Sequence, residues 1–228
     1  MIEMWELRGE DDRRYSTFSW RTRMALRHKQ LEVRYHPVLL TDKAAIGFSG
    51  GTTVPVIRDG DTVVRDSWEI AQYLERQYPT RPSLFGGATA QALARLVNDW
   101  VDRTVLAAAF PAFSCDLLPV QCAQDRPHFA ALIERLTGLA PPELKKHQPR
   151  NLERLARVVD PARATLKRQP FLSGDGPAYA DYALFSVYQW ARIAGAPDVL
   201  AGDPPLAQWF GRLLDLNDGF ARATPAGR

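Results

Sequence analysis

Patterns typical of β-strands are confined to the first third of this chain. Apolar side chains alternate with polar ones in segment 31–40, and two β-branched runs flank the dipeptide Asp59-Gly60. Asp-Gly between such runs strongly predicts a β-hairpin with a two-residue turn. After Pro79 no segment has a convincing strand pattern. The chain therefore cannot form one sheet along its whole length, and we expect a small α/β domain followed by a larger all-helical domain.

The predicted elements of the first domain alternate between strands and helices. They are, in order, a strand at 4–7, a helix at 19–30, a strand within 31–40, a glycine-bearing loop at 41–53, the hairpin at 54–64 and a helix at 66–79. A β-α-β unit implies parallel strands, whereas a hairpin adds antiparallel ones. We therefore predict a mixed, four-stranded sheet in a domain that spans residues 1–81.

The rest of the chain has helical patterns after a linker that carries proline and glycine. Apolar residues recur at helical spacing in segments 93–105 and 152–159, and a further helix is predicted at 204–216. Segment 180–193 is apolar nearly all round, which is typical of a helix buried at the centre of a bundle. We expect these helices to form a second domain, residues 88–225.

Charge and cysteine content narrow the class of protein. The 228 residues carry a net charge of +3, which is weak support for nucleic-acid binding. Only Cys115 and Cys122 are present, as expected for a reducing compartment. The first residues contain no signal-peptide core, and the longest apolar run, 105–113, is interrupted by Pro111 and too short to span a bilayer. We expect a soluble, cytoplasmic protein with no nucleic-acid or membrane partner.

Metal and nucleotide sites are not predicted. The four histidines lack ligand spacing with one another or with the cysteines, and no phosphate loop or dinucleotide fingerprint occurs. A basic cluster, Arg21, Arg23, Arg27 and Lys29, lies on the first predicted helix, and we interpret it as a solvated face.

Three hydroxyl side chains stand where the first helix begins. Ser16, Thr17 and Ser19 can cap the helix, because a side-chain oxygen accepts a hydrogen bond from a free N–H group of the first turn. The same N–H groups and the positive end of the helix dipole can instead bind an anion. The sequence of this segment alone leaves both interpretations open.

Two further dipeptides have a structural and a functional interpretation. Val54-Pro55 opens the hairpin after a glycine-rich loop, where a trans proline at a strand start or a cis peptide in a sharp turn would fit. Asp66-Ser67 opens a helix with Glu69 three residues later, which resembles a capping box. Alternatively, Ser67 holds a carboxylate and Asp66 an ammonium group, which together are the two charges of an α-amino acid.

The order and spacing of these three sites resemble the glutathione transferase family. The resemblance covers nearly the whole chain, and "FLSGDGPAYADYALF" also resembles the family's folding motif, with Asp181 in a structural capping role. It implies a thioredoxin-like domain up to about residue 80 and an all-α domain after it. Glutathione would be the co-substrate, with its cysteinyl backbone paired to the residue before a cis-proline and its γ-glutamyl end held by the acidic-Ser pair. The glutathione site that the resemblance implies comprises Ser16, Thr17, Lys43, Thr53, Val54, Pro55, Asp66 and Ser67.

Within the family the motifs look most like the serine-type, bacterial β-etherase-like and related fungal classes. Three positions depart from the family pattern. Thr17 stands where proline is common, Asp66 replaces the more usual glutamate, and Ala178 stands where serine or threonine caps the helix that carries Asp181. None of these removes the proposed active hydroxyl, which we assign to Ser16 with Ser19 as the alternate.

The resemblance predicts a glutathione transferase that activates the glutathione thiolate for attack on an electrophile, with aryl ether cleavage as one form of that attack. Two other functions stay open: a non-catalytic binding protein on the same fold, and a glutathione-dependent isomerase. We expect a homodimer. The second substrate should lie between the domains against aromatic side chains, for which the candidates are Trp100, Phe110, Phe113 and Trp190.

Overall fold

The N-terminal part of the molecule is built on a four-stranded mixed sheet, as predicted. A computed structural model describes residues 1–227. The strands are β1 (Ile2–Leu7), β2 (Val33–Val38), β3 (Val56–Asp59) and β4 (Thr62–Arg65). Their order in the sheet is β2-β1-β3-β4, with β1 parallel to β2 and antiparallel to β3, and with β3 and β4 forming the hairpin. Asp59 and Thr62 are the last pair before its turn.

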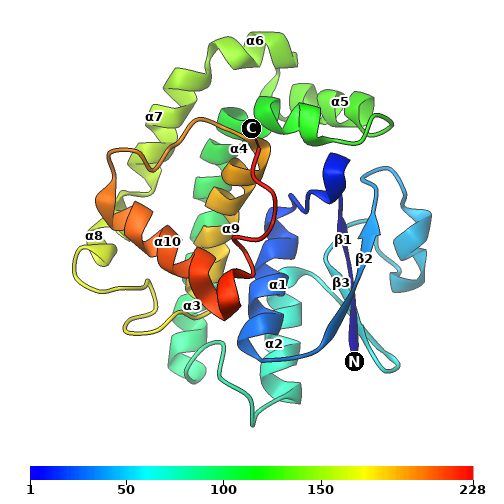
Figure 1. Cartoon of the computed structure of the whole chain (residues 1–228), viewed down its shortest axis with the longest axis vertical. Coiled ribbons are helices and arrows are strands. Elements are labelled where there is room, and N and C mark those ends of the chain that lie inside the picture. The colour runs from blue at the N-terminus through cyan, green and yellow to red at the C-terminus, as the bar shows by residue number, and fades with distance from the viewer. Residues whose placement is uncertain (228) are drawn as a thin grey trace.

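Helices cover both faces of this sheet. On one side α1 (Thr17–His28) and α2 (Ser67–Gln77) lie between the sheet and the helical part of the molecule (Figure 1). On the other side a short 3-10 helix, η2 (Ala44–Ser49), packs Ile46 against the buried side chains of Trp5 and Val56. The segment of η2 contains Gly47 and ends at glycines, so the sequence predicts only a loop there.

Among the described residues, the named elements of the C-terminal part are all helices. Its elements are α3 (Ala88–Trp100), the π-helical segment η3 (Val101–Val105), α4 (Leu106–Leu117), η4 (Leu118–Val120), α5 (Arg126–Thr137), α6 (Pro141–Lys146), α7 (Gln148–Val158), α8 (Asp160–Leu166), α9 (Tyr179–Ala194) and α10 (Pro204–Gly219). Helix α9 runs through the middle of this part and packs against α1 and α4 (Figure 1). One continuous apolar core joins the two parts of the chain.

The central position of α9 confirms the prediction of a buried helix. Nearly all of its side chains are buried. Its start is fixed by Asp181, a fully buried carboxylate that accepts hydrogen bonds from the N–H groups of Leu172 at 2.7 Å and Ala178 at 3.1 Å and from the indole of Trp209 at 2.9 Å. Since these donors come from the preceding loop and from α10, Asp181 stabilises the packing around α9 and has no contact with a cavity.

Helices α3, η3 and α4 continue into one run, Ala88–Val120. By length and composition alone, this run of 33 residues could cross a membrane. The sequence predicts no such span, because its longest apolar stretch is interrupted by Pro111. In the structure it packs against α7 and α9 as a core element. Core helices buried inside a protein pass the same test of length and composition.

The prediction that the basic cluster of α1 is a solvated face is wrong. Arg21, Arg23 and Lys29 are buried, and only Arg27 is exposed. Each buried cation has an acidic partner from a distant segment: Asp102 for Arg21 at 2.7 Å, Glu6 for Arg23 at 2.5 Å and Glu75 for Lys29 at 2.6 Å. A buried charge is stable only when it is paired, so these residues bind α1 to its neighbours.

Candidate functional site

Two neighbouring cavities share Ser16 and Phe18 at the start of α1. The larger, of about 990 Å³, lies among α1, α4 and α7. The smaller, of about 860 Å³, lies between α1, the loop after β2, and the β3–β4 hairpin with the start of α2. Both volumes are in the range of small-molecule sites. A ligand in each cavity would therefore approach the other at Ser16.

The hydroxyl of Ser16 is placed to donate a hydrogen bond to such a ligand. Ser16 is the N-cap of α1, and its Oγ accepts a 3.3 Å hydrogen bond from the N–H of Ser19. Among residues 1–227 no acceptor for the Ser16 hydroxyl proton is found. The side chain is mostly buried but lines both cavities. Because the oxygen is held by the cap, its O–H remains free for an external acceptor at the positive end of the helix dipole.

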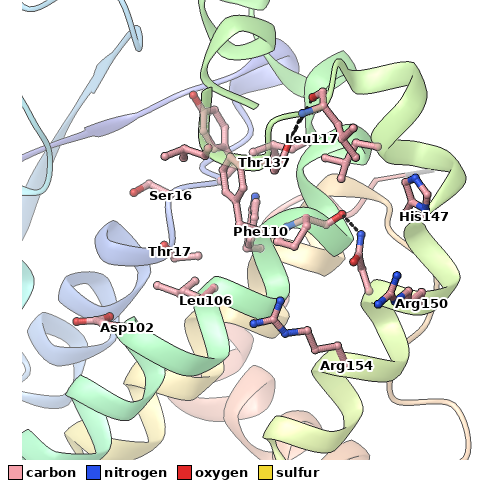
Figure 2. Close-up of a pocket in the computed structure, with 18 of the residues that line it drawn as sticks. Ser16, Thr17, Asp102, Leu106, Phe110, Leu117, Thr137, His147, Arg150 and Arg154 are labelled. Carbon is pink, nitrogen blue, oxygen red and sulfur yellow. Dashed lines mark hydrogen bonds between the residues drawn. The ribbon is translucent and has the colours of Figure 1, made fainter. Parts of the chain in front are cut away.

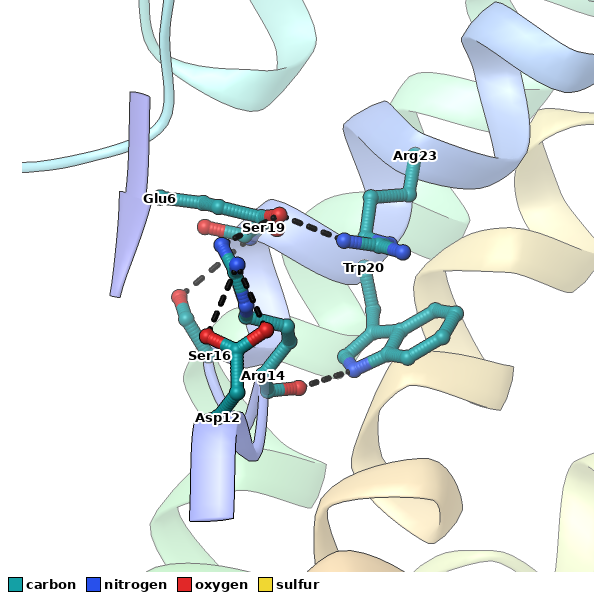
Figure 3. A network of polar contacts seen from close by, with 7 residues as sticks. All are labelled: Glu6, Asp12, Arg14, Ser16, Ser19, Trp20 and Arg23. Carbon is teal, nitrogen blue, oxygen red and sulfur yellow. Dashed lines mark hydrogen bonds and ion pairs between the residues drawn. The ribbon is translucent and has the colours of Figure 1, made fainter. Parts of the chain in front are cut away.

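The segment before Ser16 is held by an ionic network. Arg14 lies between Glu6 and Asp12, with contacts of 3.1 Å and 2.8 Å, and its carbonyl accepts a hydrogen bond from the indole of Trp20 (Figure 3). Glu6 is fully buried, so burial raises its pKa, although Arg23 and Arg14 oppose that shift. The network fixes the entry of the chain into α1 and thereby the position of the Ser16 hydroxyl.

Val54 presents an unpaired backbone to the smaller cavity. The Val54-Pro55 peptide bond is cis, as the resemblance implies, and both residues line the cavity. Strand β3 begins only at Val56. Within the described residues the N–H and C=O of Val54 have no hydrogen-bond partner. An extended peptide in this cavity could therefore pair with Val54 as an added strand does.

The start of α2 forms the opposite end of the smaller cavity. Oδ1 of Asp66 accepts hydrogen bonds from the N–H groups of Trp68 at 2.8 Å and Glu69 at 3.2 Å, so this oxygen caps the helix. Oδ2 has no partner among residues 1–227, and Asp66 and Ser67 both line the cavity. Asp66 has a φ of +69°, a backbone conformation that is rare for residues other than glycine. The two functions weighed for Asp66 are thus compatible, because each uses a different oxygen.

Most of the residues expected at the glutathione site come together in the structure. The smaller cavity is lined by Ser16, Lys43, Thr53, Val54, Pro55, Asp66 and Ser67. Thr17 instead lines the larger cavity, next to Ser16. Ser19, the alternate hydroxyl, lines neither cavity, because it is on the buried side of α1 with its hydroxyl unpaired.

The four aromatic candidates divide into two pairs. Phe110 and Trp190 line the larger cavity and stack with ring centroids 6.2 Å apart. Phe113 is fully buried and meets Trp190 edge-on, and Trp100 lines neither cavity. Helical spacing cannot reveal which face of the run Ala88–Val120 borders a cavity, which explains why the sequence proposes all four.

Basic residues of α7 are part of the larger cavity and are missed by the sequence interpretation. Arg150, Arg154 and Arg157 line it, and Figure 2 shows Arg154 reaching from α7 toward the helix that carries Leu106. Their spacing of four and then three residues places them on one helical face. That spacing was visible in the sequence, but nothing in the sequence places this face on a cavity.

The cysteines are poor candidates for chemistry. Cys115 is half-buried and Cys122 is buried, and neither lines a cavity. Burial raises the pKa of both thiols, which lowers the fraction of reactive thiolate. Residues 1–227 contain no group of three His, Cys, Asp or Glu side chains placed to hold a metal ion.

Sequence comparison identifies the class of protein with this architecture. A family model described as "Glutathione S-transferase, N-terminal domain" matches residues 15–77, and one described as "Glutathione S-transferase, C-terminal domain" matches residues 98–212. Together they cover both the sheet part and most of the helical part. The chain belongs to the glutathione S-transferase family.

Individual relatives are more distant. Glutathione S-transferase 4 of Zea mays is 25% identical over 157 residues, which is 69% of this chain and 63% of the maize protein. Glutathione S-transferase Z1 of Arabidopsis thaliana is 40% identical over 76 residues, or 30% of this chain and 34% of that protein. The matches thus span less than two thirds of the length of these curated relatives.

Solved structures show the same fold over nearly the full chain. Glutathione transferase GSTFuA3 of Phanerochaete chrysosporium has a TM-score of 0.79 at 24% identity, covering 97% of this chain and 93% of that one. Glutathione S-transferase CsGST63524 of Ceriporiopsis subvermispora, solved in complex with glutathione, has a TM-score of 0.84 at 19% identity and 99% coverage of both chains.

Proposed function

We propose that the chain is a glutathione transferase that binds glutathione in the smaller cavity and delivers its thiolate to an electrophile in the larger one. The observation that supports this most directly is the position of Ser16 where the two cavities meet, with a free O–H at a helix start. Family membership and a structural neighbour solved with glutathione support the same assignment.

Glutathione binding uses both ends of the smaller cavity. The free Oδ2 of Asp66 receives the γ-glutamyl ammonium, and Ser67 with the N-terminus of α2 receives the adjoining carboxylate. The backbone of Val54 pairs with the cysteinyl residue. Lys43 and Thr53 are the contacts for the glycyl end. In this proposed arrangement the sulfur lies beside Ser16.

Ser16 activates the thiol by stabilising its anion. A free thiol has a pKa near 8.5, so little thiolate exists at neutral pH. A hydrogen bond from the Ser16 hydroxyl and the dipole of α1 both favour the anion. Ser16 is not itself the nucleophile, because the thiolate sulfur forms the new bond to carbon.

The finer assignments are part of this proposal. Residues 1–81 form the glutathione-binding domain and residues 88–225 supply the second-substrate site. The protein is a cytoplasmic homodimer, and its reactions include displacement at aromatic carbon and aryl ether cleavage of the β-etherase type. The motifs around Ser16 and Asp66 carry the etherase comparison.

The conjugation of glutathione to 1-chloro-2,4-dinitrobenzene tests the proposal. Ser16→Ala should lower kcat strongly and leave glutathione affinity nearly unchanged, because the hydroxyl acts on sulfur alone. Ser19→Ala is the matched control, since that hydroxyl lines neither cavity. Equal activity of Ser16→Ala and the unmodified protein would refute the role of Ser16. Glutathione binding without turnover of halo-aromatics, aryl ethers or cis-enones would favour a non-catalytic binding protein. Turnover of cis-enones alone, without adduct, would favour an isomerase.

A further inference from the structure

The larger cavity has one strongly basic wall. Arg150, Arg154 and Arg157 are spaced along one face of α7 and line the cavity together with His147. Figure 2 shows Arg150, Arg154 and His147 at this wall. The acidic residue of the same helix, Glu153, does not line it. The charged side chains of α7 are therefore sorted by sign, with the cations toward the cavity.

Helix α7 is held in this orientation by side-chain bonds to α4. Gln148 donates to the carbonyl of Ala112 at 2.7 Å, and Asn151 donates to the carbonyl of Pro111 at 3.2 Å. Both donors are on the side of α7 that packs against α4. Because these bonds fix the rotation of α7, Arg154 is directed into the cavity by the packing of the fold.

The basic wall lacks a counter-charge in the protein. Among residues 1–227, none of Arg150, Arg154 and Arg157 has an acidic partner within ion-pair distance. Within residues 1–227, Asp102 is the one carboxylate that lines the cavity, and it is bound at 2.7 Å to the buried Arg21. A ligand could therefore supply the missing negative charge without competing with a carboxylate of the protein.

Apolar and aromatic side chains form another part of the cavity wall. Phe110 and Trp190 form a stacked pair in its wall, and in the view of Figure 2 Phe110 lies between Ser16 and the arginines. A flat ring against these side chains would have its reactive carbon toward Ser16 and its far end toward α7.

We infer that the electrophile for this cavity is an aromatic anion, with a carboxylate or sulfonate group that the α7 arginines bind. This inference rests on the proposed function, since it assigns the substrate class of the same site. Such a substrate is repelled by the glutathione thiolate, and the arginines offset that repulsion in the bound state. They are positioning residues, because they contact the charged group and not the reacting carbon.

Paired substrates that differ only in charge test the inference. 4-Chloro-3,5-dinitrobenzoate and its neutral carboxamide both react by formation of a carbon–sulfur bond and departure of chloride with the bonding electron pair. After correction for the uncatalysed rates, the benzoate should have the higher kcat/KM. Arg154→Gln should reduce that preference about threefold, the value for an exposed ion pair, and replacement of all three arginines should reduce it about tenfold or more. Arg168→Gln, an exposed arginine away from the cavity, is the control with the same charge change.

A second measurement separates failure of this inference from failure of the proposed function. Calorimetry with 3,5-dinitrobenzoate and 3,5-dinitrobenzamide, in the presence of S-methylglutathione, measures charge preference without turnover. Equal affinity and equal kcat/KM for the two ligands would overturn the inference while leaving a working transferase. Absence of any turnover would overturn the proposed function, and an Arg154-dependent preference in binding would still support an anion site. A rise in the KM for glutathione in Arg154→Gln would overturn the inference, because the arginine would then serve glutathione.

Discussion

The two oxygens of Asp66 allow helix capping and ligand binding to be separated by substitution. Oδ1 caps α2 through Trp68 and Glu69, whereas Oδ2 has no partner among the described residues, and Asp66 lines the smaller cavity. Asp66→Asn keeps an oxygen for the cap, since asparagine caps as well as aspartate, and tolerates positive φ. It removes only the negative charge. Asp66→Ala removes both oxygens and places an alanine at φ +69°.

The two variants should therefore differ in stability and share a defect in binding. A charge-assisted hydrogen bond contributes about 1.5–3 kcal/mol, but solvent weakens it at the exposed Asp66. We therefore expect both variants to lose about 1 kcal/mol of glutathione binding free energy, which is roughly a fivefold rise in the Kd. Asp66→Ala should also lose about 1 kcal/mol from the cap and about 1 kcal/mol from the backbone conformation. At roughly 2–4 °C per kcal/mol for a chain of this length, its Tm should fall by about 4–8 °C.

Calorimetric titration with glutathione and thermal unfolding without ligand measure the two effects on the same samples. Asp66→Asn should bind glutathione weakly and unfold within about 2 °C of the unmodified protein. If Asp66→Asn binds glutathione normally, Asp66 only caps α2, and the γ-glutamyl assignment is refuted. If Asp66→Ala has an unchanged Tm, the capping geometry does not contribute as argued.

Three further predictions concern stability and assembly. Arg21→Met should lower the free energy of unfolding by about 2 kcal/mol, because it leaves the partly exposed Asp102 without its buried partner. Lys146→Met removes a partner from an exposed ion pair and should change the free energy of unfolding by less than about 0.5 kcal/mol. Denaturant unfolding measures both changes. Burial lowers the pKa of His28 in the folded protein below its ordinary value of 6.5. The stability that neutral His28 contributes is therefore present above pH 6.5 and is lost as the pH falls below 6.5. His28→Gln should flatten the loss of Tm between neutral and mildly acidic pH, and His128→Gln, an exposed control, should not. Sedimentation should give a homodimer at micromolar concentration, and a single species of the 25.6 kDa monomer would contradict that assembly.

Local sequence patterns predict much of the fold. The Asp59-Gly60 hairpin, the parallel pairing of β1 with β2 and the buried α9 follow from periodicity and turn chemistry. Helix starts also follow from local capping residues, so the sequence predicts Ser16 and Asp66 as site residues. These features depend on residues close together in the chain.

Features that depend on distant residues are not predictable in this way. The sequence predicts a solvated Arg21 only because its partner Asp102 is 81 positions away, on a π-helical segment. The arginines of α7 have visible helical spacing, but their role depends on how Gln148 and Asn151 bind α4. Likewise, only packing decides that Phe110 lines a cavity and Phe113 does not.

The pKa of the thiol of bound glutathione tests the central claim most directly. The ultraviolet absorbance of the thiolate is titrated against pH for the glutathione complex of the unmodified protein, with the apoprotein as reference. A hydrogen bond from Ser16 to the charged sulfur, worth about 1.5–3 kcal/mol, corresponds to about one to two pKa units, so the bound thiol should titrate well below the value near 8.5 of a free thiol. A bound thiol that titrates no lower than free glutathione would contradict the proposed activation by Ser16.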